Sequence, residues 1–237
     1  MALSLPDPAA KAAVVRAMFD RIAPRYARLN TILTFGLDRG WRRAAIAATR
    51  VGAGDLVVDV ACGTGDLAAL AVAAGAHAIG VDVAPAMLAH AGGRGATLVR
   101  ADAAALPVRD GAADAVTCGF ALRNVDAIPR VLAEAARVLR PGGRFVLLEV
   151  AAPGGMLGWG HRLYFHHVVP LVGGLLSDRQ AYAYLPASAA YLPSEPALRR
   201  MIEDAGFADV RRRLLGAGSV QLVSASRAAR AMTGRAA

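Results

Sequence analysis

The sequence has little of what marks several common protein classes. Its 237 residues include only two cysteines, Cys62 and Cys118, and no C-x-x-C spacing, which excludes a disulfide scaffold and gives no sign of a zinc site. No apolar run approaches the ~20 residues that span a bilayer, and the first eight residues lack a basic region followed by a long apolar core. We therefore expect a cytoplasmic protein, soluble or peripheral at the inner face of the membrane.

Lysine is also scarce, since the 27 basic residues include a single lysine, Lys11. The net charge is +9, but apart from Arg211, Arg212 and Arg213 the basic residues are spread along the chain, with no basic patch interleaved with aromatic residues. We therefore expect no nucleic-acid partner. Attraction to an anionic membrane surface is a further expectation.

The order of apolar segments predicts an α/β fold. With 56% hydrophobic residues, a chain of this length can bury one core, so we expect a single domain over 1–237. A helical N-terminal cap is expected over 11–50, interrupted at Pro24 and near Gly36, and strands then alternate with helices. Expected strands are 56–61, 78–81, 97–100, 115–119, 144–150, 210–214 and 221–226; expected helices are 66–74, 85–90, 128–139 and 195–205. Such alternation predicts a Rossmann-like, seven-stranded, mostly parallel sheet.

Residues 151–193 break this alternation with a segment rich in glycine, aromatic and apolar residues. Because the segment follows the fifth strand, it is expected to lie over the carboxyl ends of the sheet, where open α/β folds bind ligands. We interpret it as a substrate lid. Packing into a small satellite core is the alternative for any one residue in it.

The most informative stretch runs from Asp59 to Asp66, Asp-Val-Ala-Cys-Gly-Thr-Gly-Asp. It predicts a buried strand, a glycine turn and the start of a helix, as in nucleotide-like cofactor sites. The loose G-x-G-x-x-A pattern also fits a dinucleotide, but an ionised Asp66 would repel its pyrophosphate at the helix N-terminus. S-adenosylmethionine carries a positive ammonium and sulfonium instead, and the D-x-A-x-G-x-G pattern is that of class I methyltransferases. We therefore favour the methyl donor.

Further cofactor contacts follow from position along the chain. Asp82 ends the second strand, where a carboxylate reaches ribose hydroxyls, and Met87 on the next helix can cover an adenine face. Asp102 follows the third strand and can accept a hydrogen bond from the adenine amino group. A single aspartate at the end of a strand is more often a helix cap. Helix capping is a poor explanation for four aspartates in this order, Asp59, Asp66, Asp82 and Asp102. The expected cofactor set is Asp59, Ala61, Gly63, Thr64, Gly65, Asp82, Met87, Asp102, Ala103 and Gly119.

Several longer strings resemble one known family. They are Phe19-Asp20-x-Ile22-Ala23-x-x-Tyr26-x-x-Leu29-Asn30, Gly36-Leu37-Asp38-Arg39-x-Trp41-Arg42, Leu122-Arg123-Asn124-Val125, and Tyr182-x-Tyr184-Leu185-Pro186. Over about residues 14–215 the chain resembles the UbiE/MenG type of ubiquinone and menaquinone biosynthesis C-methyltransferases. The resemblance implies methyl transfer from S-adenosylmethionine to a ring carbon of a demethylated, demethylmenaquinol-like prenyl quinol. It also implies S-adenosylhomocysteine as the product and no metal.

The resemblance also implies roles for individual residues. Arg123 and Asn124 would stabilise the phenolate of the acceptor and orient a water, with Tyr26 closing the pocket. The expected catalytic residues are therefore Arg123, Asn124 and Tyr26, and the expected substrate contacts are Tyr26, Asn30, Arg123, His166 and Tyr182. A surface ion pair is the alternative for Arg123, and packing is the alternative for the histidines of the lid.

The chain departs from the family pattern on the substrate side. It has Ala27 and Ala187 where acidic residues are usual, Gly119 where serine is often found, and an altered last strand from Ser219. These departures leave the acceptor open, so a methyltransferase of another aromatic or polyketide-like molecule is an alternative. A non-catalytic assembly protein that binds the donor is a third, against which Arg123, Asn124 and Tyr26 argue. The apolar lid predicts a membrane contact, and the oligomeric state, with a homodimer as one option, stays open.

Overall fold

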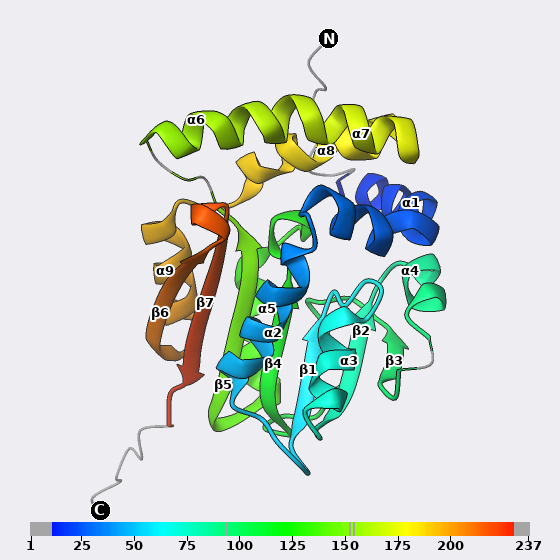
Figure 1. Cartoon of the computed structure of the whole chain (residues 1–237). Helices are drawn as coiled ribbons and strands as arrows, with labels where there is room; N and C mark the ends of the chain where they lie inside the picture. Colours follow the sequence, from blue (N-terminus) through cyan, green and yellow to red (C-terminus); the bar gives the residue numbers. More distant parts are fainter. Residues whose placement is uncertain (1–10, 93, 152, 154, 230–237) are drawn as a thin grey trace, which may run out of the picture.

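The core of the protein is a seven-stranded sheet with the order β3-β2-β1-β4-β5-β7-β6 (Figure 1). The structure is a computed structural model that describes residues 11–92, 94–151, 153 and 155–229. Neighbouring strands from β3 to β5 are parallel, whereas β7 runs antiparallel between β5 and β6. The strands are β1 (Leu56–Val60), β2 (His77–Asp82), β3 (Thr97–Arg100), β4 (Ala113–Gly119), β5 (Leu139–Val150), β6 (Phe207–Leu215) and β7 (Val220–Arg227). The predicted mostly parallel α/β fold is confirmed.

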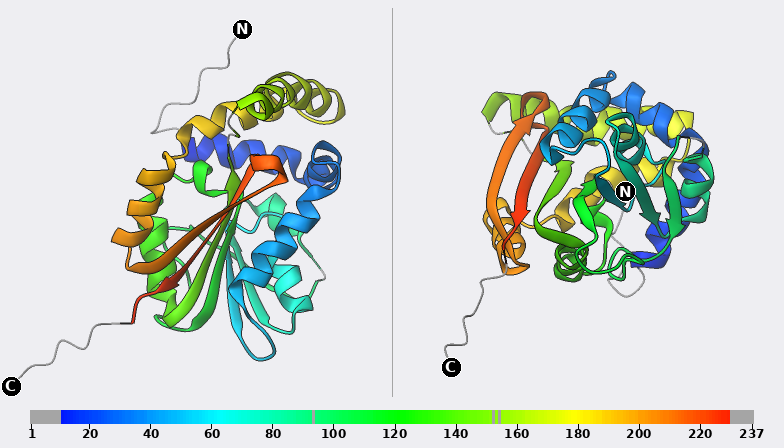
Figure 2. Two further views of the ribbon diagram at one scale, coloured as in Figure 1. Left: turned by 60° about the vertical axis from the view of Figure 1, so that its left-hand side comes forward. Right: turned by 90° about the horizontal axis from the view of Figure 1, so that it is seen from below.

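Helices cover both faces of this sheet, as Figure 2 shows from two directions. Helices α2 (Leu37–Thr49) and α3 (Asp66–Ala73) pack on one face, where Ile46 and Leu67 meet Val57 and Val146. Helices α5 (Ile128–Val138) and α9 (Glu195–Asp204) cover the other face. Strands buried on both sides read as continuous apolar runs, which is why the central strands could be located from the sequence.

The predicted N-terminal cap divides into two helices with different partners. Helix α1 (Lys11–Leu33) packs against α4 (Pro85–His90) and the helices inserted after β5, whereas α2 belongs to the layer on the sheet. Gly36, with φ 77°, separates the two, as predicted. The expected interruption at Pro24 does not occur, because buried Ile22 and Leu29 on either side of it pack into one apolar cluster.

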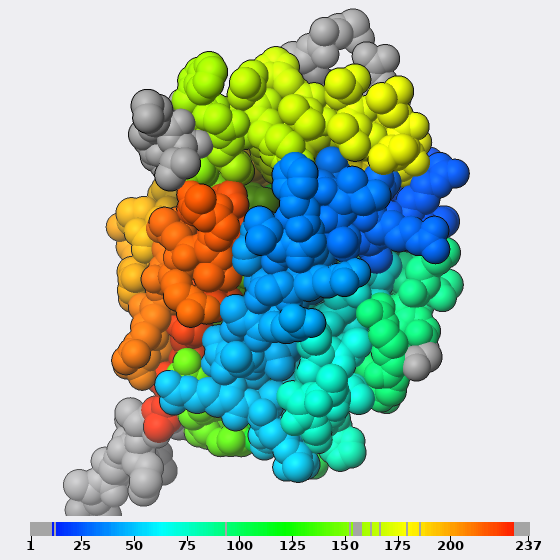
Figure 3. All heavy atoms as spheres, viewed as in Figure 1, coloured from blue at the N-terminus to red at the C-terminus, as the bar shows by residue number. Residues whose placement is uncertain are grey.

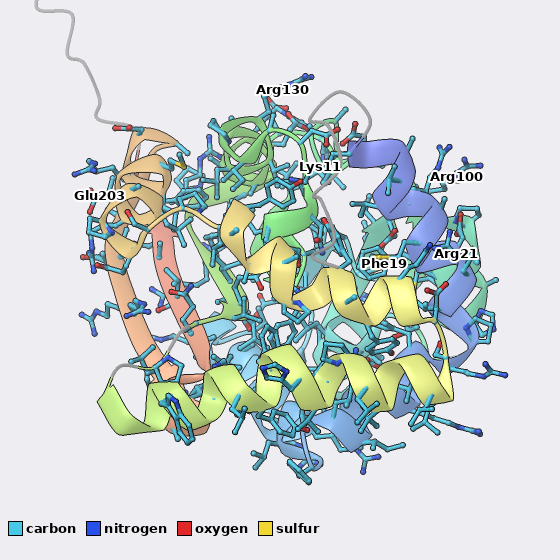
Figure 4. All side chains as sticks on the ribbon, turned by 90° about the horizontal axis from the view of Figure 1, so that it is seen from above. Lys11, Phe19, Arg21, Arg100, Arg130 and Glu203 are labelled. Atoms are coloured by element: carbon cyan, nitrogen blue, oxygen red, sulfur yellow. The ribbon has the colours of Figure 1, made fainter. Side chains whose placement is uncertain are left out.

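The segment after β5, for which the sequence predicted no regular structure, is mostly helical. It forms α6 (Gly155–Leu163), a π-helical turn η2 (Tyr164–Val168), α7 (Val169–Leu176), α8 (Arg179–Ser188) and a short turn η3 (Ala189–Tyr191), together called the inserted helices below. They lie above the edge of the sheet where the parallel strands end (Figure 1). Seen from above, α6 and α7 form one outer rod with α8 beside it (Figure 4). Among the described residues, no helix is long and apolar enough to cross a membrane.

Close contacts fix the inserted helices to each other and to α1. A Cβ atom on Gly173 would lie 2.1 Å from Cγ of Tyr182, so only glycine lets α7 approach α8 this closely. Arg21 of α1 donates to Asp178 at 3.0 Å, and the same carboxylate caps α8 by accepting from the amide of Ala181. The inserted helices and α1 therefore form one packed layer above the sheet.

Most predicted boundaries differ from the observed ones by one to three residues, but β5 differs more. It begins at Leu139 rather than Arg144, because Leu139 pairs with Ala113 of β4 and its carbonyl accepts from Arg227. The Pro141-Gly142-Gly143 sequence, expected to be a turn before the strand, is therefore part of the irregular start of β5. The short turns η1 (Leu122–Asn124) and η4 (Gly216–Gly218) complete the described elements.

Candidate functional site

A first cavity of about 440 Å³ lies at the carboxyl ends of β1, β2 and β4. The predicted cofactor residues come from four separate stretches of sequence and gather there because the ends of parallel strands share one edge of a sheet. The expected residues that line it are Asp59, Ala61, Gly63, Thr64, Asp82, Met87, Asp102, Ala103 and Gly119. Gly65 does not line it; its φ of 71° ends the turn before α3.

The glycine loop after β1 is held in a left-handed backbone conformation. Ala61, Gly63 and Gly65 all have positive φ, at 52°, 55° and 71°. The amide of Gly65 donates to the carbonyl of Cys62 at 2.9 Å, which closes the turn. A Cβ atom on Gly63 would meet nothing within 4 Å, so the space beside this residue is open to a ligand.

Asp82 anchors this loop to β2. Its two carboxylate oxygens accept from the amides of Gly63 and Ala84, both at 2.8 Å. Burial raises the pKa of Asp82, while the two amide hydrogen bonds act in the opposite direction. The carboxylate is thus fixed beside the cavity, where its remaining lone pairs can accept from a ligand hydroxyl.

Asp59 is buried, and both of its carboxylate oxygens accept hydrogen bonds from the protein. It accepts from the hydroxyl of Thr117 at 2.8 Å and from the amide of Ala68 at 3.2 Å, which ties β4 and the start of α3 to β1. Burial raises its pKa to about 7. The expected contact of Asp59 with the cofactor stays a prediction, and its hydrogen bonds point to a role in holding the cavity wall.

The raised pKa of Asp59 predicts a pH-dependent stability. Because the folded chain holds this proton more tightly than the unfolded chain does, the stability it contributes is full below about pH 4 and is lost as the pH rises through 7. We expect Asp59→Asn, which stays neutral, to gain up to about 4 kcal/mol in unfolding free energy relative to the wild type between pH 4 and 8. Urea unfolding of both chains at several pH values measures this difference, and a constant difference would contradict it.

Asp66 is flanked by two guanidinium groups. Arg94 donates to its Oδ1 at 2.9 Å, and Nη2 of Arg42 lies 3.6 Å from its Oδ2. These two partners compensate the charge of Asp66, so it would repel a pyrophosphate less than the sequence alone predicts. The charge of Asp66 therefore does not by itself distinguish the methyl donor from a dinucleotide.

A second cavity, of about 240 Å³, adjoins the first. It lies among α1, α2, the inserted helices, the end of β5 and the start of β7, and most of its lining is apolar. Three of the expected substrate residues, Tyr26, Asn30 and Arg123, line it. Tyr26, Arg42 and Phe120 line both cavities and so form the wall between them.

Arg123 is buried in an ion pair rather than exposed on the surface. Its guanidinium contacts the carboxylate of Glu149, which is 0% exposed, and donates to the hydroxyl of Ser188 at 3.1 Å and the carbonyl of Phe120 at 2.9 Å. These contacts join β5, η1 and the end of α8. The pair therefore positions the wall of the second cavity, in addition to any contact of Arg123 with a substrate.

The other expected substrate-side residues take different positions. Asn124 lines the first cavity and accepts from the hydroxyl of Tyr184 at 3.3 Å, and burial raises the pKa of Tyr184 to about 12. Tyr182 lines neither of the two cavities; it is 0% exposed, and its buried hydroxyl has no hydrogen-bond partner among the described residues. The side chain of His166 lies outside what the structure describes. We therefore expect Tyr182 to support the site through packing.

Sequence reasoning missed Arg42 and Phe120. Asp38 and Arg42 stand four residues apart in a string that served only to support the family resemblance, although this spacing on a helix predicts an ion pair. Nothing in the sequence indicated that the pair would be buried between two cavities. In the described ranges, no three His, Cys, Asp or Glu side chains form a group that could hold a metal ion.

Sequence comparisons with known proteins match nearly the whole chain. The sequence model of the ubiE/COQ5 methyltransferase family matches residues 8–227. A demethylmenaquinone methyltransferase of Thermus thermophilus is 46% identical over 211 residues, covering 85% of this chain and 96% of the relative. A ubiquinone/menaquinone biosynthesis C-methyltransferase UbiE of Syntrophotalea carbinolica is 42% identical over 223 residues, covering 90% and 93%.

Solved structures agree on the fold. A SAM-dependent methyltransferase of Thermotoga maritima, described as a possible histamine N-methyltransferase, superposes with a TM-score of 0.65 over 90% of this chain and 99% of its own. The two sequences are 18% identical, so the likeness concerns the fold alone. The sheet order and the paired cavities described above thus occur on a methyltransferase fold.

Proposed function

The chain belongs to the ubiE/COQ5 methyltransferase family, and from this we propose that it methylates a ring carbon of a demethylated prenyl quinol of the menaquinone type. The family is SAM-dependent, and S-adenosylmethionine supplies the methyl group. The acceptor is inferred from relatives at 42–46% identity whose names specify demethylmenaquinone or both quinones. The single observation that supports this function is the pair of adjoining cavities, one lined by the glycine loop and the other mainly apolar.

The first cavity suits the donor. We propose that Asp82 accepts from the ribose hydroxyls, that Met87 covers the adenine, and that Gly63 leaves room for the backbone to approach the ligand. Asp102, which is exposed and holds the amide of Ala104 through Oδ1 at 2.8 Å, would use its other oxygen for the adenine amino group. The chemistry of the donor is the transfer of a methyl cation equivalent from a positive sulfur.

The second cavity suits an aromatic ring with an apolar tail. In the proposed reaction, the acceptor hydroxyl first loses its proton to water, which makes the neighbouring ring carbon nucleophilic. That carbon forms a bond to the methyl carbon while the sulfur–methyl bond breaks, and its electron pair stays on sulfur. The ring carbon then loses its hydrogen as a proton, which regenerates the phenolate, and the oxygen takes up a proton again, so that one proton is released net per methyl transferred. Tyr26 and Phe120, in the wall between the cavities, would hold the ring for this in-line approach.

A turnover assay tests the proposal. We expect the enzyme, given S-adenosylmethionine and chemically reduced demethylmenaquinol, to yield a methyl-sized mass gain in the quinol and equimolar S-adenosylhomocysteine by mass spectrometry. Demethylated benzoquinols tested beside it decide the ring type. No gain, with donor binding shown in the same sample, would overturn the quinol assignment and favour another aromatic acceptor, because the atypical Ser219 and Val220 line the second cavity.

We also propose that the outer face of the inserted helices rests on an anionic lipid bilayer. Large exposed apolar side chains occur there in two pairs, each with a spacing of four residues, at Trp159 and Leu163 and at Leu171 and Leu175, the last of them 78% exposed. Figure 3 shows this surface meeting that of α1 and α2, where Phe35, 80% exposed, lines the second cavity. A prenyl tail leaving the cavity would thus emerge beside this face.

Flotation with anionic vesicles tests the membrane contact. We expect wild-type protein to float with the vesicles and Leu171→Glu/Leu175→Glu to remain at the bottom of the gradient, because the two charges oppose burial among the lipids. Val14→Glu, at an exposed apolar residue of α1, is the matched control and should float. Equal flotation of the double variant, or none of the wild type, would overturn the proposed face.

A further inference from the structure

The wall between the two cavities is where donor and acceptor must meet. Methyl transfer needs the sulfur, the methyl carbon and the ring carbon in line, so the reacting atoms can lie only at the boundary of the two spaces. Three side chains line both cavities: Tyr26, Arg42 and Phe120. Among the described residues, Arg42 is the single charged member of this shared wall, which makes it the first residue to consider for stabilising charge at the reacting ring.

Arg42 is held rigidly by groups on both sides. On α2 its Nη1 pairs with the carboxylate of Asp38, which also accepts from the hydroxyl of Thr34 at 3.1 Å. On the donor side its Nη2 lies 3.6 Å from Asp66, and its guanidinium carbon lies 5.8 Å from the ring centre of Phe120. A buried guanidinium fixed in this way needs little reorganisation to bind an anion, which is the condition for effective electrostatic stabilisation.

The charges around Arg42 explain why its loss would oppose ionisation of the acceptor. Arg42 and Arg94 balance the carboxylates of Asp38 and Asp66, so this cluster is formally neutral. A phenolate formed beside it meets a neutral cluster with guanidinium N–H donors. Without Arg42 the same phenolate would face a net negative cluster, which opposes ionisation. Of the other titratable groups near the wall, Tyr26 lines both cavities, Asp59 and Asp82 line the first, and Arg123, His161 and Tyr164 line the second.

Arg123 is less suited to this task. It lines the second cavity but not the first, and its guanidinium already contacts Glu149, Ser188 and the carbonyl of Phe120. Both arginines pair with a buried carboxylate, so what distinguishes them is position: of the two, only Arg42 also lines the first cavity. The family resemblance pointed to Arg123 as the stabiliser of the phenolate, and the geometry favours Arg42 for that charge.

We propose that Arg42 is a catalytic residue that donates a hydrogen bond to the ionising ring hydroxyl of the acceptor and stabilises the phenolate during methyl transfer. This proposal rests on the proposed function, since it concerns the same acceptor. It predicts that Arg42 lowers the pKa of the bound acceptor hydroxyl, so that the rising limb of the kcat–pH profile lies at lower pH in its presence.

Arg42→Gln tests this directly. We expect kcat near neutral pH to fall by about 100-fold or more, as for the loss of one preorganised donor, and the rising limb of the profile to move up by at least one pH unit. The dissociation constant for S-adenosylhomocysteine should change by less than about threefold. Arg42→Lys keeps the charge, and so should keep the position of the limb while lowering kcat. The matched control is Arg43→Gln, a change at the exposed neighbouring residue, and it should behave as wild type.

A merely structural role for Arg42 gives a different result. Arg42→Gln would then lower the melting temperature or weaken donor binding while its kcat–pH profile kept the wild-type position, and that outcome would overturn the proposal. A nitronaphthol probe, titrated by its visible phenolate absorbance on the enzyme loaded with S-adenosylhomocysteine, keeps the test valid should Arg42→Gln fail to fold. Its pKa should fall on binding to wild-type protein; an unchanged or raised pKa would overturn the proposal. Because the probe needs no turnover, this measurement distinguishes failure of this inference from failure of the quinol assay.

Discussion

Arg123→Met is expected to lower the unfolding free energy by about 3–5 kcal/mol, the usual cost of breaking a buried ion pair by removing one partner. The change leaves the carboxylate of Glu149, which is 0% exposed, without its guanidinium. It also removes the hydrogen bonds that join η1 to Ser188 at the end of α8. Urea denaturation followed by circular dichroism measures the loss, and a variant as stable as the wild type would contradict this account of the pair.

The double variant Arg123→Met/Glu149→Leu separates stability from catalysis. Replacing both charges by apolar side chains removes the uncompensated carboxylate, so most of the lost stability should return. If the restored protein also recovers turnover, Arg123 acts by positioning the cavity wall. If it is stable but inactive, the guanidinium contacts the acceptor, as the family resemblance implied. This comparison is needed because a single substitution at Arg123 would reduce activity in either case.

Asp82→Ala is expected to weaken binding of S-adenosylhomocysteine by at least about 100-fold. A charged acceptor bonded to two ribose hydroxyls contributes about 1.5–3 kcal/mol for each bond that is lost. The change also frees the amide of Gly63, which now donates to Asp82 at 2.8 Å and holds the glycine loop. Isothermal titration calorimetry, performed below the melting temperature of the variant, gives the dissociation constant.

Asp102→Ala serves as the comparison for Asp82→Ala. Asp102 lines the same cavity but is exposed and caps only the short turn at Ala104, so its removal should cost about tenfold or less in affinity. A larger loss at Asp102 than at Asp82 would reverse the proposed orientation of the donor. Affinity within threefold of wild type for Asp82→Ala would remove Asp82 from the ribose site.

The sequence was sufficient for the features that depend on local pattern. Apolar runs such as Leu56 to Val58 located the central strands, and the glycines at 63 and 65 located the loop that needs positive φ. The helix boundary at Gly36 was predictable for the same reason. The passage of α1 through Pro24 was not, because it depends on how Ile22 and Leu29 pack against elements far along the chain.

The charges of the site could not be assigned from the sequence, because each depends on a partner distant in the chain. Asp66 is neutralised by Arg94, 28 residues away, and Arg123 by Glu149, 26 residues away. Asp59 is engaged by Thr117, 58 residues away. The sequence identified these residue types and their order, whereas their protonation and availability to a ligand are set by tertiary contacts. The role proposed for Arg42 likewise depends on a tertiary arrangement, the position of α2 between the two cavities.

The π-helical turn at Tyr164–Val168 is a point at which the rod formed by α6 and α7 can change in length without changing its faces. Such a turn accommodates one more residue than the corresponding α-turn. Deleting a single residue there would convert it to α-helix and leave the orientation of α7 nearly unchanged, whereas a deletion within α6 or α7 would rotate the residues beyond it by about 100°. A deletion in the first turn of α7 would thus turn Leu171 and Leu175 away from the apolar face. Homologues should therefore differ in length within this rod mainly at residues 164–168, by the one residue that separates a π-turn from an α-turn, and otherwise at the connections at its two ends.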